Sequence, residues 1–134
     1  MIIDPSAIVA IIYGEPEDKA FLNLISNSQT CLISSPGYLE LAIVLSTAYG
    51  SKGIEKLDLF LQELSISIVS FTSEHAKLAT EAFLTFGKGR HPAKLNMGDC
   101  FSYALAKATG QPLLFKGNDF SQTDINVAYN DRSI

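Results

Sequence analysis

The stretch that decides the fold begins at residue 95 and reads Leu95-Asn96-Met97-Gly98-Asp99-Cys100-Phe101-Ser102-Tyr103-Ala104-Leu105-Ala106. No residue from Cys100 to Ala106 is charged, which predicts a helix that is buried on nearly all sides. Asn96 can cap this helix, and Asp99 then stands at its third position, where the capping geometry and the helix dipole favour a carboxylate. Helix capping alone explains Asp99 about as well as a functional role does. Whether Asp99 belongs to a functional site therefore depends on the other carboxylates of the chain.

Length and composition predict a single domain over residues 1–134. The chain is 47% hydrophobic and 18% charged, which is typical of a compact protein with a well-filled core. No apolar run is long enough to cross a membrane, and the N-terminal Met1-Ile2-Ile3-Asp4 lacks the basic leader of a signal peptide. Cys31 and Cys100 lie in apolar segments without metal-site spacing, so we expect reduced core thiols and a cytoplasmic protein.

The formal net charge is −4, which is not the charge of a protein that coats nucleic acid by electrostatics alone. A nuclease is still compatible with this charge, because a carboxylate cluster that binds a metal adds negative charge of its own.

A short apolar run, Ile2-Ile3, ends at Asp4 and leads into Pro5, which suits the first position of a helix that ends near Tyr13. A strand that ends at Asp4 places this residue at the carboxyl edge of a sheet, where open α/β folds bind their ligands. Helix capping is an equally good explanation of Asp4.

Glu40 is the only charged residue in a predicted helix that runs from about Ser35 to Tyr49. Its helical neighbours at three and four residues' distance are apolar or small, so we expect Glu40 to project from an apolar face. Because an unpaired buried carboxylate is costly, such a group is usually paired or metal-bound.

The rest of the chain alternates short strands with helices. We expect helices over 16–27, 52–64 and 73–86, strands over 30–33, 66–71 and 112–115, and a final edge strand over 124–128. His75, near the start of the helix over 73–86, is expected to be a surface or helix-cap residue. This alternation predicts a three-layer α/β/α sandwich with a mostly parallel sheet of four or five strands.

Basic residues flank the predicted site. The loop that leads to Asp99 contains Lys88, Arg90 and Lys94, and Lys116 follows the strand over 112–115. We expect these four side chains to contact phosphates; the alternative is that the loop over 87–94 is ordinary solvated surface. Asp119 stands in the next turn, where it is either a turn-forming residue or a further carboxylate of the site.

Asp4, Glu40, Asp99 and Asp119 can converge on one edge of such a domain. Carboxylate oxygens without Cys or His partners suit Mg²⁺ or Mn²⁺, which can activate a water to attack a phosphodiester. A phospho-receiver domain would use the same edge, but only one Asp follows Ile2-Ile3 here. A haloacid-dehalogenase-type phosphatase needs a second Asp where Ser6 stands.

This ordered set of motifs resembles the PIN-domain family and, within it, the VapC-type toxins of toxin–antitoxin pairs. The resemblance covers nearly the whole chain. It rests on residues 2–7 and 38–40 and is strongest over 87–93, 95–101 and 113–120.

The resemblance implies an endoribonuclease that needs Mg²⁺ or Mn²⁺, acts as a homodimer and is blocked by a VapB-like antitoxin. Asp4 and Asp99 would be the main metal ligands, Glu40 and Asp119 would complete the acidic site, and Ser6 and Asn96 would be accessory residues. The chain departs from the family at Pro5, where relatives have Thr or Ser, and at Asn118, where they often have Asp. A stand-alone or slow nuclease and a non-enzymatic receiver-like module remain the alternatives.

Overall fold

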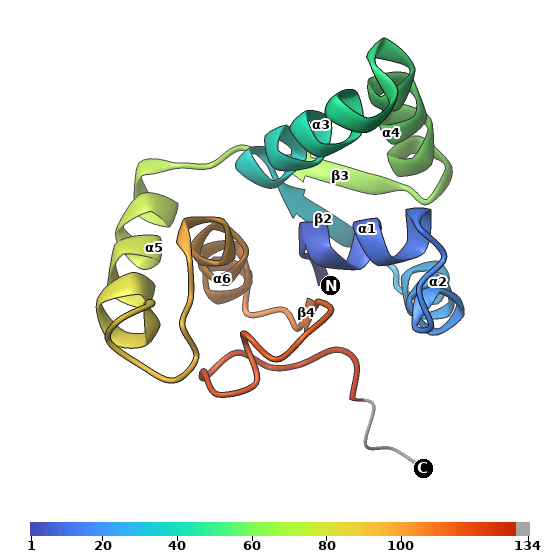
Figure 1. Ribbon diagram of the computed structural model, residues 1–134. Coiled ribbons are helices and arrows are strands. Elements are labelled where there is room, and N and C mark those ends of the chain that lie inside the picture. The colour runs from blue at the N-terminus through green and yellow to red at the C-terminus, as the bar shows by residue number, and fades with distance from the viewer. Residues whose placement is uncertain (131–134) are drawn as a thin grey trace.

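The computed structural model describes residues 1–130, which form a parallel sheet with helices on both faces (Figure 1). This architecture confirms the predicted α/β fold class. The elements in chain order are β1 (Ile2–Ile3), α1 (Pro5–Ile12), α2 (Asp18–Ser26), β2 (Cys31–Ser34), α3 (Ser35–Tyr49), α4 (Ser51–Glu63), β3 (Ile66–Val69), α5 (Ser73–Phe86), α6 (Met97–Thr109) and β4 (Leu113–Leu114).

The four strands pair in the order β3-β2-β1-β4, and every pair is parallel. Successive residues of β1 serve opposite faces: Ile2 packs in the apolar cluster with α5 and α6, whereas Ile3 packs in the cluster with α1 to α4. Leu113 and Leu114 of β4 divide in the same way. Because helices cover both faces at β1 and β4, these two strands are apolar at consecutive positions rather than at alternate ones.

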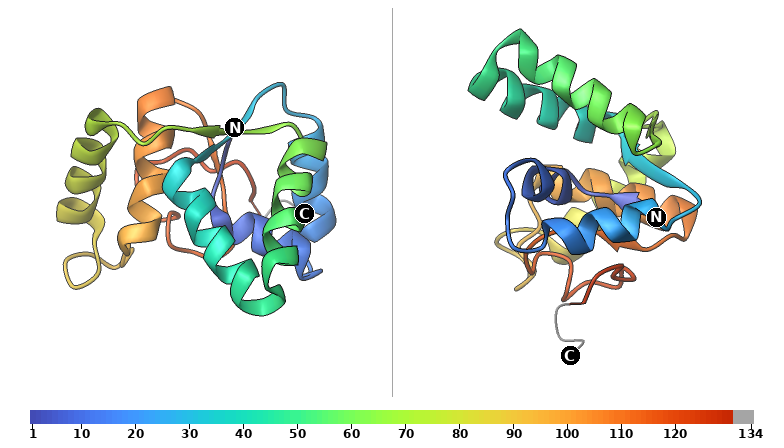
Figure 2. Two further views of the ribbon diagram at one scale, coloured as in Figure 1. Left: turned by 90° about the horizontal axis from the view of Figure 1, so that it is seen from above. Right: turned by 90° about the vertical axis from the view of Figure 1, so that its right-hand side faces the viewer.

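The helices pack in three consecutive pairs, α1 with α2, α3 with α4, and α5 with α6. Figure 2 shows α3 and α4 side by side and antiparallel in both views. Their tight turn centres on Gly50, which has a positive φ of 66°, and Gly53 lies so close to the Leu45 carbonyl that a Cβ would come within 2.2 Å of its oxygen. Glycine at residue 53 therefore allows the two helices to approach closely.

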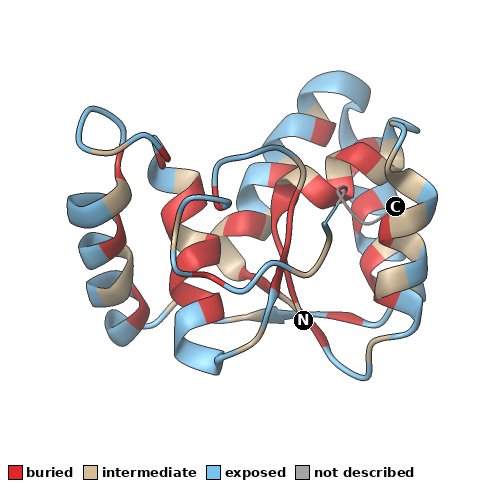
Figure 3. Ribbon diagram, turned by 90° about the horizontal axis from the view of Figure 1, so that it is seen from below, coloured by how far each residue is buried: buried red, intermediate tan, exposed pale blue. Residues whose placement is uncertain are grey.

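Helix α6 is the most buried helix of the fold, as the sequence predicts (Figure 3). Apart from the half-buried Phe101, every residue from Asp99 to Ala106 is buried. Asn96 and Asp99 form the expected capping box at its start. Because the chain passes from α6 into β4, which is parallel to the other strands, α6 runs antiparallel to the sheet. Its N-terminus therefore lies at the carboxyl edge of the strands.

Three local expectations differ from the structure. The second helix begins at Asp18 and not at Pro16, and the expected strand over 124–128 is only a parallel bridge between Leu113 and Val127. His75 was expected on the surface or at the helix cap. Its backbone N–H does donate to the capping Thr72 Oγ1 at 3.1 Å, but its side chain is only 8% exposed and its ring packs edge-on against Phe71 at 5.9 Å.

None of the helices within residues 1–130 combines the length and apolar character that crossing a membrane requires. Cys31 and Cys100 are free thiols, and both are buried.

Candidate active site

The carboxyl edge of the sheet contains a pocket of about 360 Å³, which we call the acidic pocket. The strand order reverses between β1 and β4, and open α/β sheets bind ligands at such a switch point. Helices α1 and α3 begin at this edge because each follows a strand directly, and α6 begins there because it runs antiparallel to the sheet. The residues lining the pocket are Asp4, Pro5, Ser6, Val9, Glu15, Glu40, Asn96, Gly98, Asp99 and Lys116.

Asp4 is the most deeply buried carboxylate of the pocket, with an exposed fraction of 6%. Its Oδ2 accepts a hydrogen bond from the Ser6 backbone N–H at 3.0 Å, so Asp4 caps α1 as expected. Its Oδ1 accepts a hydrogen bond from the Ser102 hydroxyl at 2.5 Å. Burial raises the pKa of Asp4, the hydrogen bonds from Ser102 and Ser6 oppose that rise, and the negative charge of Asp119 adds to it.

Asp99 serves as a cap and also belongs to the pocket. Its backbone N–H donates to Asn96 Oδ1 at 2.9 Å, and its Oδ2 accepts from the Asn96 backbone N–H at 3.1 Å. The pKa of Asp99 is raised to about 7, chiefly by burial and further by the nearby carboxylates Asp119 and Asp4. The hydrogen bond from Asn96 offsets only part of this rise. A cap that served stability alone would not be placed beside two further carboxylates.

Glu40 reaches the pocket from the second turn of α3. The sequence predicted a buried carboxylate at this position, but Glu40 is exposed. Ile43 and Val44 are themselves 56% and 38% exposed, so this face of α3 is apolar without being buried. Partial desolvation still raises the pKa of Glu40, and the charge of Asp4 raises it further. Glu40 also lies against the first turn of α6, because a Cβ on Gly98 would stand 2.6 Å from Glu40 Oε1.

Asp119 is exposed and does not line the acidic pocket. Its charge nevertheless contributes to the raised pKa of both Asp4 and Asp99, which places it at the rim of the pocket. The structure therefore brings three of the four predicted carboxylates into one pocket and leaves the fourth beside it.

Lys116 is the one predicted basic residue that lines the pocket. Its backbone N–H donates to Ser6 Oγ at 3.0 Å, and its ammonium group forms ion pairs with Glu15 and, at 3.5 Å, with Glu17. The structure does not bring the other predicted basic residues, Lys88, Arg90 and Lys94, into the pocket: all three are exposed on the loop between α5 and α6.

Sequence reasoning missed Ser102, Glu15 and Glu17. Ser102 had a detectable signal, because it is a polar residue in an otherwise apolar helix and lies one turn after Asp99. Glu15 and Glu17 had none, because their partner Lys116 is about a hundred residues away in the chain.

The acidic pocket has the chemistry of a site for a hard divalent cation. The charged forms of its three carboxylates are all disfavoured by desolvation and by one another, and a cation would relieve both effects. Within residues 1–130, no group of three or more Asp, Glu, His or Cys side chains is arranged so that it could hold a metal ion by itself. A cation here would therefore need ligands besides these side chains, as Mg²⁺ does when it keeps several waters and contacts one or two carboxylates.

Comparison with known proteins agrees with this site. Residues 1–126 match the PIN domain family. Ribonuclease VapC30 of Mycobacterium tuberculosis is 46% identical over 125 residues, which cover 93% of this chain and 95% of that protein. Ribonuclease VapC of Mycolicibacterium smegmatis is 46% identical over 129 residues, which cover 96% of this chain and all of that protein.

Solved structures show the same fold. A toxin–antitoxin complex from Klebsiella pneumoniae aligns with a TM-score of 0.74 at 15% identity and covers 96% of this chain and 98% of that chain. VapC20 of M. tuberculosis, a sarcin–ricin loop cleaving toxin, aligns with a TM-score of 0.73 at 14% identity and covers 92% and 95% of the two chains. The fold, the acidic pocket and the similarity along the chain together show that this protein belongs to the PIN-domain family, among the VapC ribonucleases.

Proposed function

We propose that this protein is a metal-dependent endoribonuclease of the VapC toxin type, which cleaves structured RNA and is neutralised by a VapB-like antitoxin. The observation that carries the proposal is the convergence of Asp4, Glu40 and Asp99 on one pocket at the switch point of the sheet. The relatives at 46% identity are named ribonucleases, which supports the reaction class.

Asp4 and Asp99 are the residues that would hold Mg²⁺ or Mn²⁺. The bound metal would supply an activated water and would stabilise negative charge on the phosphodiester. Ser102 and the Ser6 backbone hold Asp4 by both of its oxygens, and the Asn96 backbone holds Asp99. These hydrogen bonds fix the direction of the two carboxylates before a substrate arrives.

Glu40 is the pocket carboxylate best placed for proton transfer. It is accessible to solvent, and its pKa is raised. A pKa closer to the working pH makes a carboxylate a more effective general base. We assign to its carboxylate the removal of a proton from the attacking water. Asp119 at the rim would add to the negative field that retains the cation.

The antitoxin and a homodimer belong to the same proposal. Solved structures of this fold include VapBC complexes from Rickettsia felis and Salmonella typhimurium, which supports a VapB-like partner. The structure also exposes apolar side chains that a partner could cover: Met97 is 72% exposed, Leu84 56%, and Leu39 59%. Static light scattering of the purified chain, alone and with its antitoxin, would measure both assemblies.

The deciding experiment is calorimetric titration of Mn²⁺ into the wild type, Asp99→Asn and the control Glu55→Gln, together with a cleavage assay on a structured RNA. Glu55 is exposed on α4 and does not line the acidic pocket. We expect metal binding and cleavage in the wild type and the control, and loss of both in Asp99→Asn. A wild type that binds no Mn²⁺ and cuts no RNA would refute the nuclease and favour a receiver-like module.

A further inference from the structure

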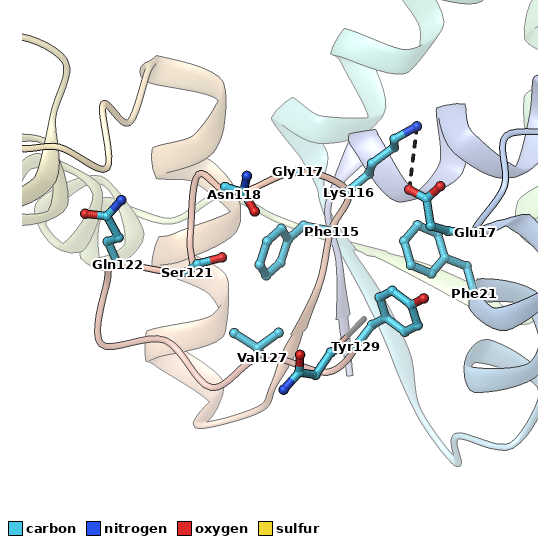
Figure 4. Close-up of a pocket in the computed structure, with 11 residues that line it drawn as sticks. Glu17, Phe21, Phe115, Lys116, Gly117, Asn118, Ser121, Gln122, Val127 and Tyr129 are labelled. Atoms are coloured by element: carbon cyan, nitrogen blue, oxygen red, sulfur yellow. Dashed lines mark ion pairs between the residues drawn. The ribbon is translucent and has the colours of Figure 1, made fainter. Parts of the chain in front are cut away.

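A second cavity, of about 540 Å³, lies next to the acidic pocket, and we call it the side pocket (Figure 4). Lys116 lines both cavities, so the two cavities adjoin at this residue. The hydrogen bond from the Lys116 backbone to Ser6 Oγ fixes the wall that the two cavities share. A volume of this size is within the range of small-ligand sites, roughly 300–1,000 Å³.

The charges on the wall of the side pocket cancel. Glu17 and Lys116 are its only charged lining residues within residues 1–130, and they pair with each other at 3.5 Å, as the dashed line in Figure 4 shows. The acidic pocket next to it is strongly negative by comparison. The side pocket therefore suits an uncharged group better than a phosphate or a metal ion.

Three uncharged polar side chains of the side pocket, Asn118, Ser121 and Gln122, come from the segment that follows β4 and are exposed to solvent. No hydrogen bond joins any of these three side chains to another residue in the described part of the chain. They provide both donors and acceptors. These hydrogen-bonding groups are thus available to a ligand.

Aromatic rings provide the apolar part of the side pocket. Figure 4 shows the Phe115 ring between the segment that carries Ser121 and the ring of Tyr129. Tyr129 is held by an edge-on contact with Phe21, with ring centroids 5.2 Å apart and an interplanar angle of 87°. Phe21 and Phe115 are themselves buried and form the floor of the side pocket. The half-buried ring of Tyr129 is the aromatic surface on which a planar ligand can pack while the amides contact its edge.

We propose that the side pocket binds one unstacked nucleobase of the RNA, next to the phosphate that lies at the acidic pocket. Proteins recognise single-stranded RNA by packing splayed bases against aromatic rings and by hydrogen-bonding their polar edges, and the side pocket offers both kinds of contact. The position of this base next to the cleaved phosphodiester rests on the proposed function. The binding of a nucleobase is argued independently, from the residues that line the side pocket.

The test uses the uncharged nucleosides adenosine, guanosine, cytidine and uridine, each titrated into metal-free ¹⁵N-labelled protein and followed by NMR. Nucleosides carry no phosphate, so the acidic pocket does not repel them. We expect saturable shifts of the Asn118, Ser121 and Gln122 amides with at least one nucleoside. Asn118→Ala and Gln122→Ala should each weaken binding by about three- to tenfold, as expected for the loss of one hydrogen bond.

Ser121→Trp fills the side pocket and should abolish binding, whereas Asn126→Ala is the matched control. Asn126 is exposed in the same segment and does not line the pocket. If Ser121→Trp fails to fold, the nucleoside affinities of Asn118→Ala and Gln122→Ala test the inference instead. Binding that is absent in the wild type, or unchanged in these variants, would overturn the inference.

A parallel RNA cleavage assay on the wild type separates this result from the proposed function. Nucleoside binding without cleavage supports the side pocket and counts against the nuclease. Cleavage without nucleoside binding supports the nuclease and overturns the side pocket.

Discussion

The Ser102 hydroxyl donates a hydrogen bond to Oδ1 of Asp4 across a sequence separation of 98 residues. This contact joins the buried helix α6 to the end of β1, and it fixes the one oxygen of Asp4 that the cap of α1 leaves free.

Replacing Ser102 by Ala should weaken Mn²⁺ binding and lower RNA cleavage, each by about tenfold, because groups that orient metal ligands typically contribute at least that much. Ser102→Thr keeps the hydroxyl and should restore most of both. Calorimetric titration and cleavage rates measure the effect. Equal losses in the Ala and Thr variants would mean that Ser102 acts only through packing.

The metal-free protein should lose stability as the pH rises from about 4 to about 7. Burial raises the pKa of Asp99 from 3.8 to about 7, so the folded state binds this proton more tightly than the unfolded state does. The stabilisation is complete below the unfolded pKa and disappears as the pH rises through the folded one. Thermal unfolding across this range measures it. Asp99→Asn should flatten the curve, and Mn²⁺ should stabilise the wild type most near neutral pH.

Gly98→Ala should separate stability from activity. Alanine in a helix is more stable than glycine by about 0.5–1 kcal/mol, so the variant should unfold at the same or a higher temperature. The new methyl group would stand 2.6 Å from the present position of Glu40 Oε1 and must displace that carboxylate, whereas its 3.3 Å approach to the capping Asn96 Oδ1 needs only a small shift. Cleavage should fall by about ten- to a hundredfold, as expected when a reacting group is misplaced.

A double-mutant cycle tests whether this loss acts through Glu40. If it does, Gly98→Ala combined with Glu40→Gln should be no slower than Glu40→Gln alone. Additive losses would show that Gly98 affects cleavage by another route.

Replacing Lys88 and Arg90 together by Gln should weaken RNA binding and reduce its salt dependence. Each lost phosphate contact lowers the slope of log K against log salt by about 0.7 on single-stranded RNA. Fluorescence anisotropy at several salt concentrations measures both quantities. Lys52→Gln with Lys56→Gln on α4 is the control, and an unchanged slope in the Lys88 and Arg90 variant would mark their loop as ordinary surface.

Local signals in the sequence predicted most of the fold. The uncharged run after Asp99 predicted the buried helix α6, and Asn96 with Asp99 predicted its capping box, because both depend on residues close together in the chain. The carboxylates at the ends of elements were predictable for the same reason. In a parallel sheet, the place of Asp4 after β1 fixes the edge at which it lies.

The parts that failed depend on contacts between distant residues. The burial of His75 follows from its packing against Phe71, and Ile43 and Val44 are exposed because no element within residues 1–130 covers that face of α3. Hydropathy along a helix does not reveal which face another element will cover. The ion pairs of Lys116 with Glu15 and Glu17 are equally invisible in the sequence.

The place of β1 between β2 and β4 has a consequence for the order in which the protein is made. Asp4 leaves the ribosome first, but Asp99 and Ser102 follow almost a hundred residues later, and β4 comes after both. A chain still in synthesis therefore has no acidic pocket while most of its sequence is already exposed. We expect a fragment that ends at Gly110, and so lacks β4, to bind no Mn²⁺ and cut no RNA. On the proposed function, the chain would gain nuclease activity only after β4 has been made.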